Sequence, residues 1–117
     1  MIDKKALREQ YKRMKKDMGI YSLTCLPTGK IYVGWAQDLH GKMNGTAARL
    51  NGSFHVCRNL QADWDRYGAE NFRIQVEELM EAEEDESKTD YQEDLKVFLE
   101  LWLETNGEKY PAVERLK

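Results

Sequence analysis

Long hydrophobic runs are missing from this sequence, and its mean hydropathy is low, at −0.77. The longest stretch without a charged residue, 18–29, contains glycine, serine, threonine and proline, so it is too short and too polar to cross a bilayer. No apolar signal core follows Met1. The sequence therefore predicts neither a membrane partner nor a secreted protein.

Cysteine is scarce as well. Cys25 and Cys57 alone cannot form a disulfide framework, which favours a reducing, cytoplasmic compartment. The phosphate-binding P-loop, the GxGxxG dinucleotide fingerprint and the GxSxG nucleophile elbow are all absent. His55 and Cys57 are too close and too isolated for a zinc framework, which needs paired clusters, so packing or capping is their simpler role.

The net charge of −3 is unevenly distributed along the chain. Residues 1–17 hold seven basic and three acidic side chains, and residues 18–76 hold six basic and four acidic ones. Residues 77–100 hold eleven acidic side chains and only two basic ones. This asymmetry predicts either an anionic partner on the basic side or simply solvated charge at both ends.

The 117 residues suffice for one domain with a modest core, since 41% of them are hydrophobic and 10% are aromatic. Apolar residues at helical spacing predict a basic amphipathic helix over residues 1–17. A single domain, 18–110, would follow it, with strands at 19–25, 30–35 and 72–77, helices at 38–50, 56–67 and 89–104, an acidic link at 78–88 and a tail at 111–117. This order predicts an α+β fold, in which a three-stranded sheet, made of an N-terminal hairpin and one later strand, is flanked by helices.

The register of the hairpin decides which side chains share a face. If Cys25 pairs with Lys30, then Tyr21 lies opposite Gly34, and Tyr32 projects to the same side as Tyr21. A slip of one residue would place the two tyrosines on opposite faces. Two phenols, a bare glycine and Lys42 on the next helix could position water and neutralise charge at a phosphodiester. The alternative is that the tyrosines are ordinary half-buried sheet residues.

The same residues resemble a known signature. Gly19-Ile20-Tyr21, followed after ten residues by Tyr32-Val33-Gly34, is similar to the paired motif of the GIY-YIG nuclease superfamily. Residues 59–72 also resemble a segment of small bacterial members, and the likeness extends over about residues 18–79. The resemblance implies a small sheet flanked by helices, and a metal-dependent cut of a phosphodiester bond.

The resemblance also implies roles for single residues. Catalytic positions would fall on Tyr21, Tyr32 and Gly34, and Lys42 stands where the family has an arginine. Thr46 stands where a histidine or tyrosine is often found. The metal-binding glutamate would align with Leu99, next to Glu100, and an offset of one residue turns a helical side chain by about 100°. Glu100 is thus the candidate ligand for Mg²⁺ or Mn²⁺.

Three functions remain open from the sequence. The first is a metal-dependent endonuclease, and the second is an inactive module that binds DNA rather than RNA, with steep salt dependence. The third is a protein-interaction domain that uses its acidic surface, or a homodimer that pairs this surface with the basic helix. The candidate nucleic-acid-binding residues are Lys4, Arg8, Lys12, Arg13, Lys15, Lys16, Arg49 and Arg58.

Overall fold

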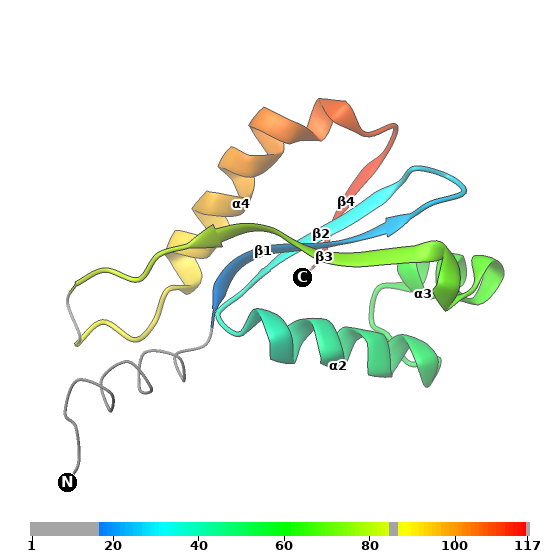
Figure 1. Ribbon diagram of the computed structural model, residues 1–117, viewed down its shortest axis with the longest axis horizontal. Coiled ribbons are helices and arrows are strands. Elements are labelled where there is room, and N and C mark those ends of the chain that lie inside the picture. The colour runs from blue at the N-terminus through cyan, green and yellow to red at the C-terminus, as the bar shows by residue number, and fades with distance from the viewer. Residues whose placement is uncertain (1–16, 85–86, 117) are drawn as a thin grey trace, which may run out of the picture.

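The computed structural model describes residues 17–84 and 87–116 of the chain (Figure 1). The predicted basic helix therefore lies outside the described residues, apart from its last position. The elements are β1 Met18–Cys25, β2 Ile31–Ala36, α2 Leu39–Asn51, α3 Arg58–Tyr67, β3 Phe72–Met80, α4 Gln92–Asn106 and β4 Val113–Arg115, with 3₁₀ turns η1 at Ala69–Asn71 and η2 at Gly107–Lys109. In this part of the chain, none of the helices has the length and apolar character needed to span a membrane.

The sheet has four strands, in the order β3-β1-β2-β4, so the prediction of three strands was wrong. β1 pairs antiparallel with β2 and with β3, whereas β4 pairs parallel with β2. β4 lies in the predicted tail. Its pairing with β2 joins residues that are far apart in the sequence. A strand of three residues is also too short to show the alternation of apolar and polar residues by which strands are predicted. β3 also continues to Met80, into the predicted acidic link.

The hairpin has the predicted register. Tyr21 lies opposite Gly34 and Leu23 lies opposite Tyr32, while the Cys25 amide donates to the Lys30 carbonyl at 2.9 Å. Side chains two residues apart on a strand point to the same face. The two tyrosines therefore share one face of the sheet, as the sequence indicates.

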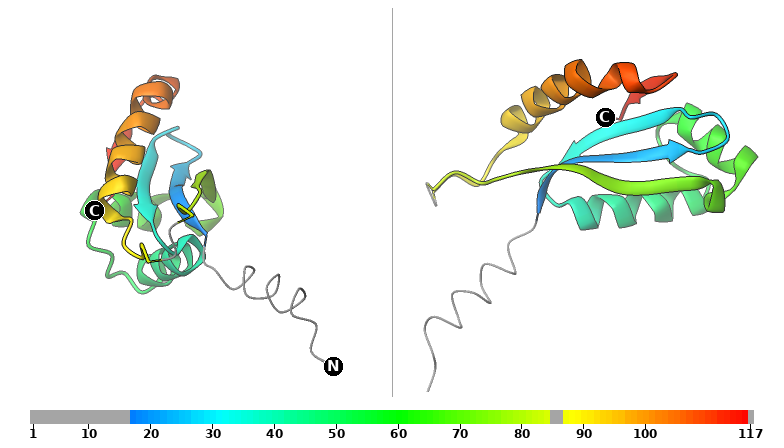
Figure 2. Two further views of the ribbon diagram at one scale, coloured as in Figure 1. Left: turned by 90° about the vertical axis from the view of Figure 1, so that its left-hand side faces the viewer. Right: turned by 45° about the horizontal axis from the view of Figure 1, so that its top comes forward.

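Helices cover both faces of the sheet, and Figure 2 shows α4 on one side and α2 with α3 on the other. The core is accordingly divided in two. Tyr21, Leu23 and Tyr32 pack with Leu39 and Leu60 of α2 and α3. On the opposite face, Ile20, Ile31 and Val33 pack with Leu99 and Trp102 of α4. Successive side chains of β1 and β2 thus point to opposite faces of the sheet, and only residues on the same face can belong to one site.

The predicted start of α2 is confirmed. The Asp38 carboxylate accepts a hydrogen bond from the Gly41 amide at 3.0 Å, which caps the first turn of the helix. Because the Leu39 amide also donates to the Asp17 carbonyl at 2.9 Å, the helix is held against the residue that precedes β1. α2 is thereby fixed along the face that carries the tyrosines.

Candidate functional site

Tyr21 and Gly34 form the centre of the site. The Tyr21 ring lies directly over Gly34 on the neighbouring strand, and both residues are buried. A Cβ atom at Gly34 would lie 3.0 Å from both Cε1 and the hydroxyl oxygen of Tyr21. Glycine at this position therefore lets the ring lie flat on the hairpin, where a larger residue would push it away.

The Tyr21 hydroxyl points toward α2. It is within hydrogen-bonding contact of the Thr46 hydroxyl, which itself donates to the Lys42 carbonyl at 2.7 Å. Burial raises the pKa of Tyr21 to about 12, although Thr46 and the charge of Arg49 act in the opposite direction. The phenol is therefore neutral at physiological pH. Thr46 is buried and serves as its polar partner.

Tyr32 has a different set of partners. Its hydroxyl donates to Asp63 Oδ2 of α3 at 2.5 Å, and Lys30 Nζ lies 4.6 Å from the centre of its ring. Burial, followed by the hydrogen bond to Asp63, raises the pKa of Tyr32 well above its usual range. The two tyrosines thus share a face, but their hydroxyl groups bind separate partners on separate helices.

A cluster of nitrogen-bearing side chains lies along α2 and the loop after it, and one of them, Arg49, acts electrostatically on Tyr21. Lys42 and Arg49 project from α2, and His55 lies in the loop that connects α2 to α3. Burial lowers the pKa of His55, and the positive charges of Arg49 and Lys42 lower it further, so the imidazole is neutral at pH 7. His55 Nδ1 accepts a hydrogen bond from the Cys57 amide at 3.0 Å. The spacing of His55 and Cys57 in the sequence does not predict that His55 lies close to the cations of α2.

Glu114 of β4 is the centre of a second polar cluster that the sequence analysis missed. Its carboxylate accepts hydrogen bonds from the Cys57 thiol at 3.0 Å, the Asn59 amide at 2.9 Å and the Lys30 ammonium at 3.1 Å. These contacts, that of Cys57 foremost, lower the pKa of Glu114. Burial together with the Glu114 carboxylate raises the pKa of the Cys57 thiol. The cluster ties β4 to the start of α3, and it contains no reactive thiolate.

The comparisons with known proteins concern the fold. No family model and no curated protein sequence matches this chain. A structure of the catalytic domain of the homing endonuclease I-TevI is similar, with a TM-score of 0.64 and 20% identity over 86% of this chain and 98% of that one. A mutant of the catalytic domain of the intron endonuclease I-TevI gives a TM-score of 0.62 and 20% identity over 80% and 87%. This chain has the GIY-YIG fold.

Within this GIY-YIG fold, Glu100 does not lie with the tyrosines. It is on α4, across the sheet from Tyr21, and its Oε2 atom binds the Arg115 guanidinium at 2.8 Å. The Glu100 and Arg115 side chains are 54% and 60% exposed. Leu99, where the resemblance led us to expect the metal-binding glutamate, is only 4% exposed and packs against the apolar side of β1 and β2. The inward position is therefore occupied by an aliphatic side chain.

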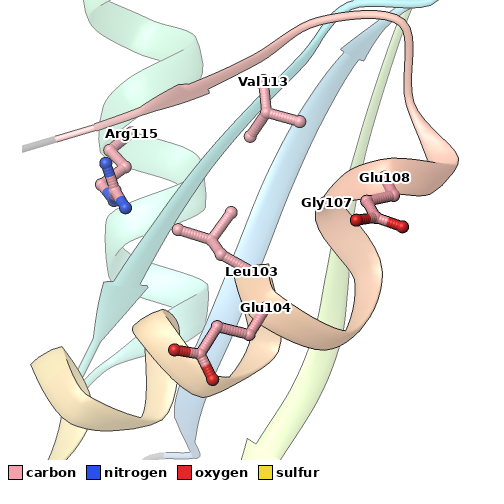
Figure 3. A pocket seen from close by; sticks show the side chains of 6 residues that line it. All are labelled: Leu103, Glu104, Gly107, Glu108, Val113 and Arg115. Carbon is pink, nitrogen blue, oxygen red and sulfur yellow. The ribbon is translucent and has the colours of Figure 1, made fainter.

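The carboxylate expected to bind a metal ion, Glu100, does not lie beside the tyrosines. Among residues 17–84 and 87–116, no group of three or more His, Cys, Asp or Glu side chains converges either. A hollow between the end of α4 and β4 is lined by Leu103, Glu104, Gly107, Glu108, Val113 and Arg115 (Figure 3). The carboxylates of Glu104 and Glu108 point in different directions there, and Arg115 already binds Glu100. The GIY-YIG fold is thus present, and the one carboxylate that the resemblance implied as a metal ligand lies across the sheet from the tyrosines.

The predicted nucleic-acid-binding residues divide into two groups. Lys4, Arg8, Lys12, Arg13, Lys15 and Lys16 lie outside the described residues. Arg49 and Arg58 are exposed, near the end of α2 and at the first residue of α3. Together with the partly exposed Lys42, they make no ion pair with any side chain in the described ranges. These cations flank the face that carries Tyr21.

Proposed function

We propose that this chain is a nuclease-like DNA-binding domain that binds the phosphate backbone without cutting it. The observation that carries the proposal is the position of Lys42 and Arg49. Arg49 acts electrostatically on the buried Tyr21, and Lys42 lies one helical turn before Thr46, the polar partner of Tyr21. Neither cation is neutralised by a carboxylate among the described residues. Unpaired cations of this kind are what bind phosphates and make the affinity depend on salt.

Two features support binding without cleavage. A tyrosine that activates water must accept a proton, yet the pKa of Tyr21 is about 12 and that of Tyr32 is higher still, so both phenols keep their protons at neutral pH. Glu100 is engaged with Arg115 on the far side of the sheet, and Leu99 offers no oxygen. Binding without hydrolysis is therefore supported, among the described residues, by cations that are available on α2, by phenols that stay protonated, and by the position of Glu100 away from them.

The binding experiment compares the charge-removed variant K42Q/R49Q with the control K96Q/K109Q. The control lysines are exposed on α4 and η2, away from the tyrosine face. Fluorescence anisotropy with a labelled DNA duplex is measured between about 50 and 200 mM salt. We expect K42Q/R49Q to bind more weakly, with a salt slope reduced by about 1 for each phosphate that the variant no longer binds, and the control to bind as the wild type does. Equal binding by both variants, or stronger binding to an RNA of the same sequence, would contradict the proposal.

The cleavage experiment addresses the endonuclease alternative, which the fold similarity to a catalytic domain favours. Supercoiled plasmid and single-stranded DNA are incubated with the protein and Mg²⁺ or Mn²⁺, alongside the variant Y21F. We expect no nicking by the wild-type protein. Nicking that Y21F abolishes would show that the chain is an active endonuclease and would overturn the non-cleaving assignment.

A further inference from the structure

The loop between α2 and α3, residues 52–57, exposes two large apolar side chains. Phe54 is 66% exposed and Val56 is 80% exposed, whereas His55 between them is only partly exposed and feels the positive charges of Arg49 and Lys42. Neighbouring apolar side chains that are exposed at the edge of a charged surface offer a contact for the apolar face of a ligand. This pair of side chains is named the apolar tip.

Hydrogen bonds hold the apolar tip in one position. The Phe54 amide donates to the Arg49 carbonyl at 3.0 Å, and the His55 amide donates to Gln61 Oε1 at 3.0 Å. Ser53, at the start of this loop, has a φ of 62°, a left-handed conformation that is uncommon for residues other than glycine. The Phe54 ring also lies against Gly52, where a Cβ atom would collide with it. Because the loop is already ordered, a ligand that binds the ring loses little conformational entropy to the loop.

The charge around the apolar tip favours a nucleotide. Residues 49–58 contain two arginines, Arg49 and Arg58, and no acidic residue. Arg49 also acts electrostatically on both His55 and Tyr21, so the tip adjoins the phosphate-binding face. An aromatic ring beside arginines is the usual arrangement for single-stranded nucleic acid, in which bases stack on the ring and the cations follow the backbone. A fully paired duplex keeps its base faces stacked and offers none to Phe54.

We infer that the apolar tip binds an unpaired base in DNA. The base stacks on Phe54 and Val56, and Arg49 with Arg58 contacts the phosphates on either side of it. This inference rests on the proposed DNA binding and adds a preference to it. The domain would select gaps, bulges or single strands over intact duplex.

The test measures the affinity of the protein for three labelled DNAs of the same sequence: a paired duplex, a duplex with one bulged base, and a single strand. We expect the wild type to bind the bulged and single-stranded DNAs several-fold more tightly than the duplex. F54A should lose about fivefold or more on the unpaired DNAs, and little on the duplex, because base stacking is measured at this size by alanine substitution. F54W should keep the preference.

The matched control is V97A, which removes an apolar side chain that is 60% exposed on α4, across the sheet. V97A should bind all three DNAs as the wild type does. Phe54 is mostly exposed, so F54A should fold normally, and a thermal melt monitored by circular dichroism checks this. Binding to DNA that does not distinguish the three forms, or that F54A leaves unchanged, would overturn this inference and leave DNA binding intact. No binding to any DNA would overturn the proposed function itself.

Discussion

Ionisation of Tyr21 should weaken the fold at alkaline pH by an amount that the structure sets. The buried phenol has a pKa of about 12, against an ordinary value of 10.0 in the unfolded chain. Because folding favours the neutral form, this stabilisation is fully present below about pH 10 and is lost as the pH rises through 12. A difference of two pKa units between the folded and unfolded chain corresponds to about 3 kcal/mol of folding free energy. Roughly half of this stabilisation is lost by about pH 11.

The variant Y21F isolates this contribution, because Phe cannot ionise while other groups titrate equally in both proteins. At neutral pH, Y21F should be about 1 kcal/mol less stable than the wild type, since it lacks the contact with Thr46. By about pH 11 the difference should vanish or reverse.

Urea unfolding followed by circular dichroism, at several pH values from about 8 to 11, measures both proteins under identical conditions. If the wild type and Y21F lose stability in parallel over this range, the buried phenol ionises as readily as a free one. In that case the argument that Tyr21 stays protonated, and cannot act as a base, fails.

Three further substitutions test other parts of the structure. G34A should destabilise the fold by about 1–3 kcal/mol, because the new methyl group must displace the Tyr21 ring; an unchanged urea midpoint would contradict the observed packing. E100A should change stability by less than about 1 kcal/mol and leave DNA binding as it is, since the pair with Arg115 is exposed; a loss of metal-dependent cleavage would instead make this carboxylate catalytic. Y32F should cost about 1.5 kcal/mol in thermal or urea unfolding, because its carboxylate partner loses a charge-assisted hydrogen bond; a neutral effect would contradict that bond.

Local chemistry explains which parts of the fold the sequence predicts well. The Pro-Thr-Gly turn sets the pairing of Cys25 with Lys30, and every later pair in the hairpin follows from that one. The side chain of Asp38 needs only the next three residues to cap α2. Both interactions join residues that are close together in the sequence, so they can be predicted without knowing the rest of the structure.

Long-range contacts explain what the sequence does not predict. β4 is too short to show the alternation of a strand in its sequence, and its partner β2 lies far earlier in the chain. The sequence pattern therefore does not predict this strand. The neighbourhoods of His55, Asp63 and Glu114 arise only when separate helices and strands meet. The position of Leu99 is a partial exception. An aliphatic residue at the core-facing position of an amphipathic helix favours an outward Glu100, as the structure has it.

The sheet separates two layers of side chains that do not share a core. Tyr21 belongs to one layer and Leu99 to the other, so a substitution in one layer should have little effect on packing in the other. Substitutions on the α4 side can therefore accumulate without repacking the tyrosine side, so the two faces of one small sheet can diverge separately in evolution. The same partition would let an engineer redesign one face while leaving the other as it is.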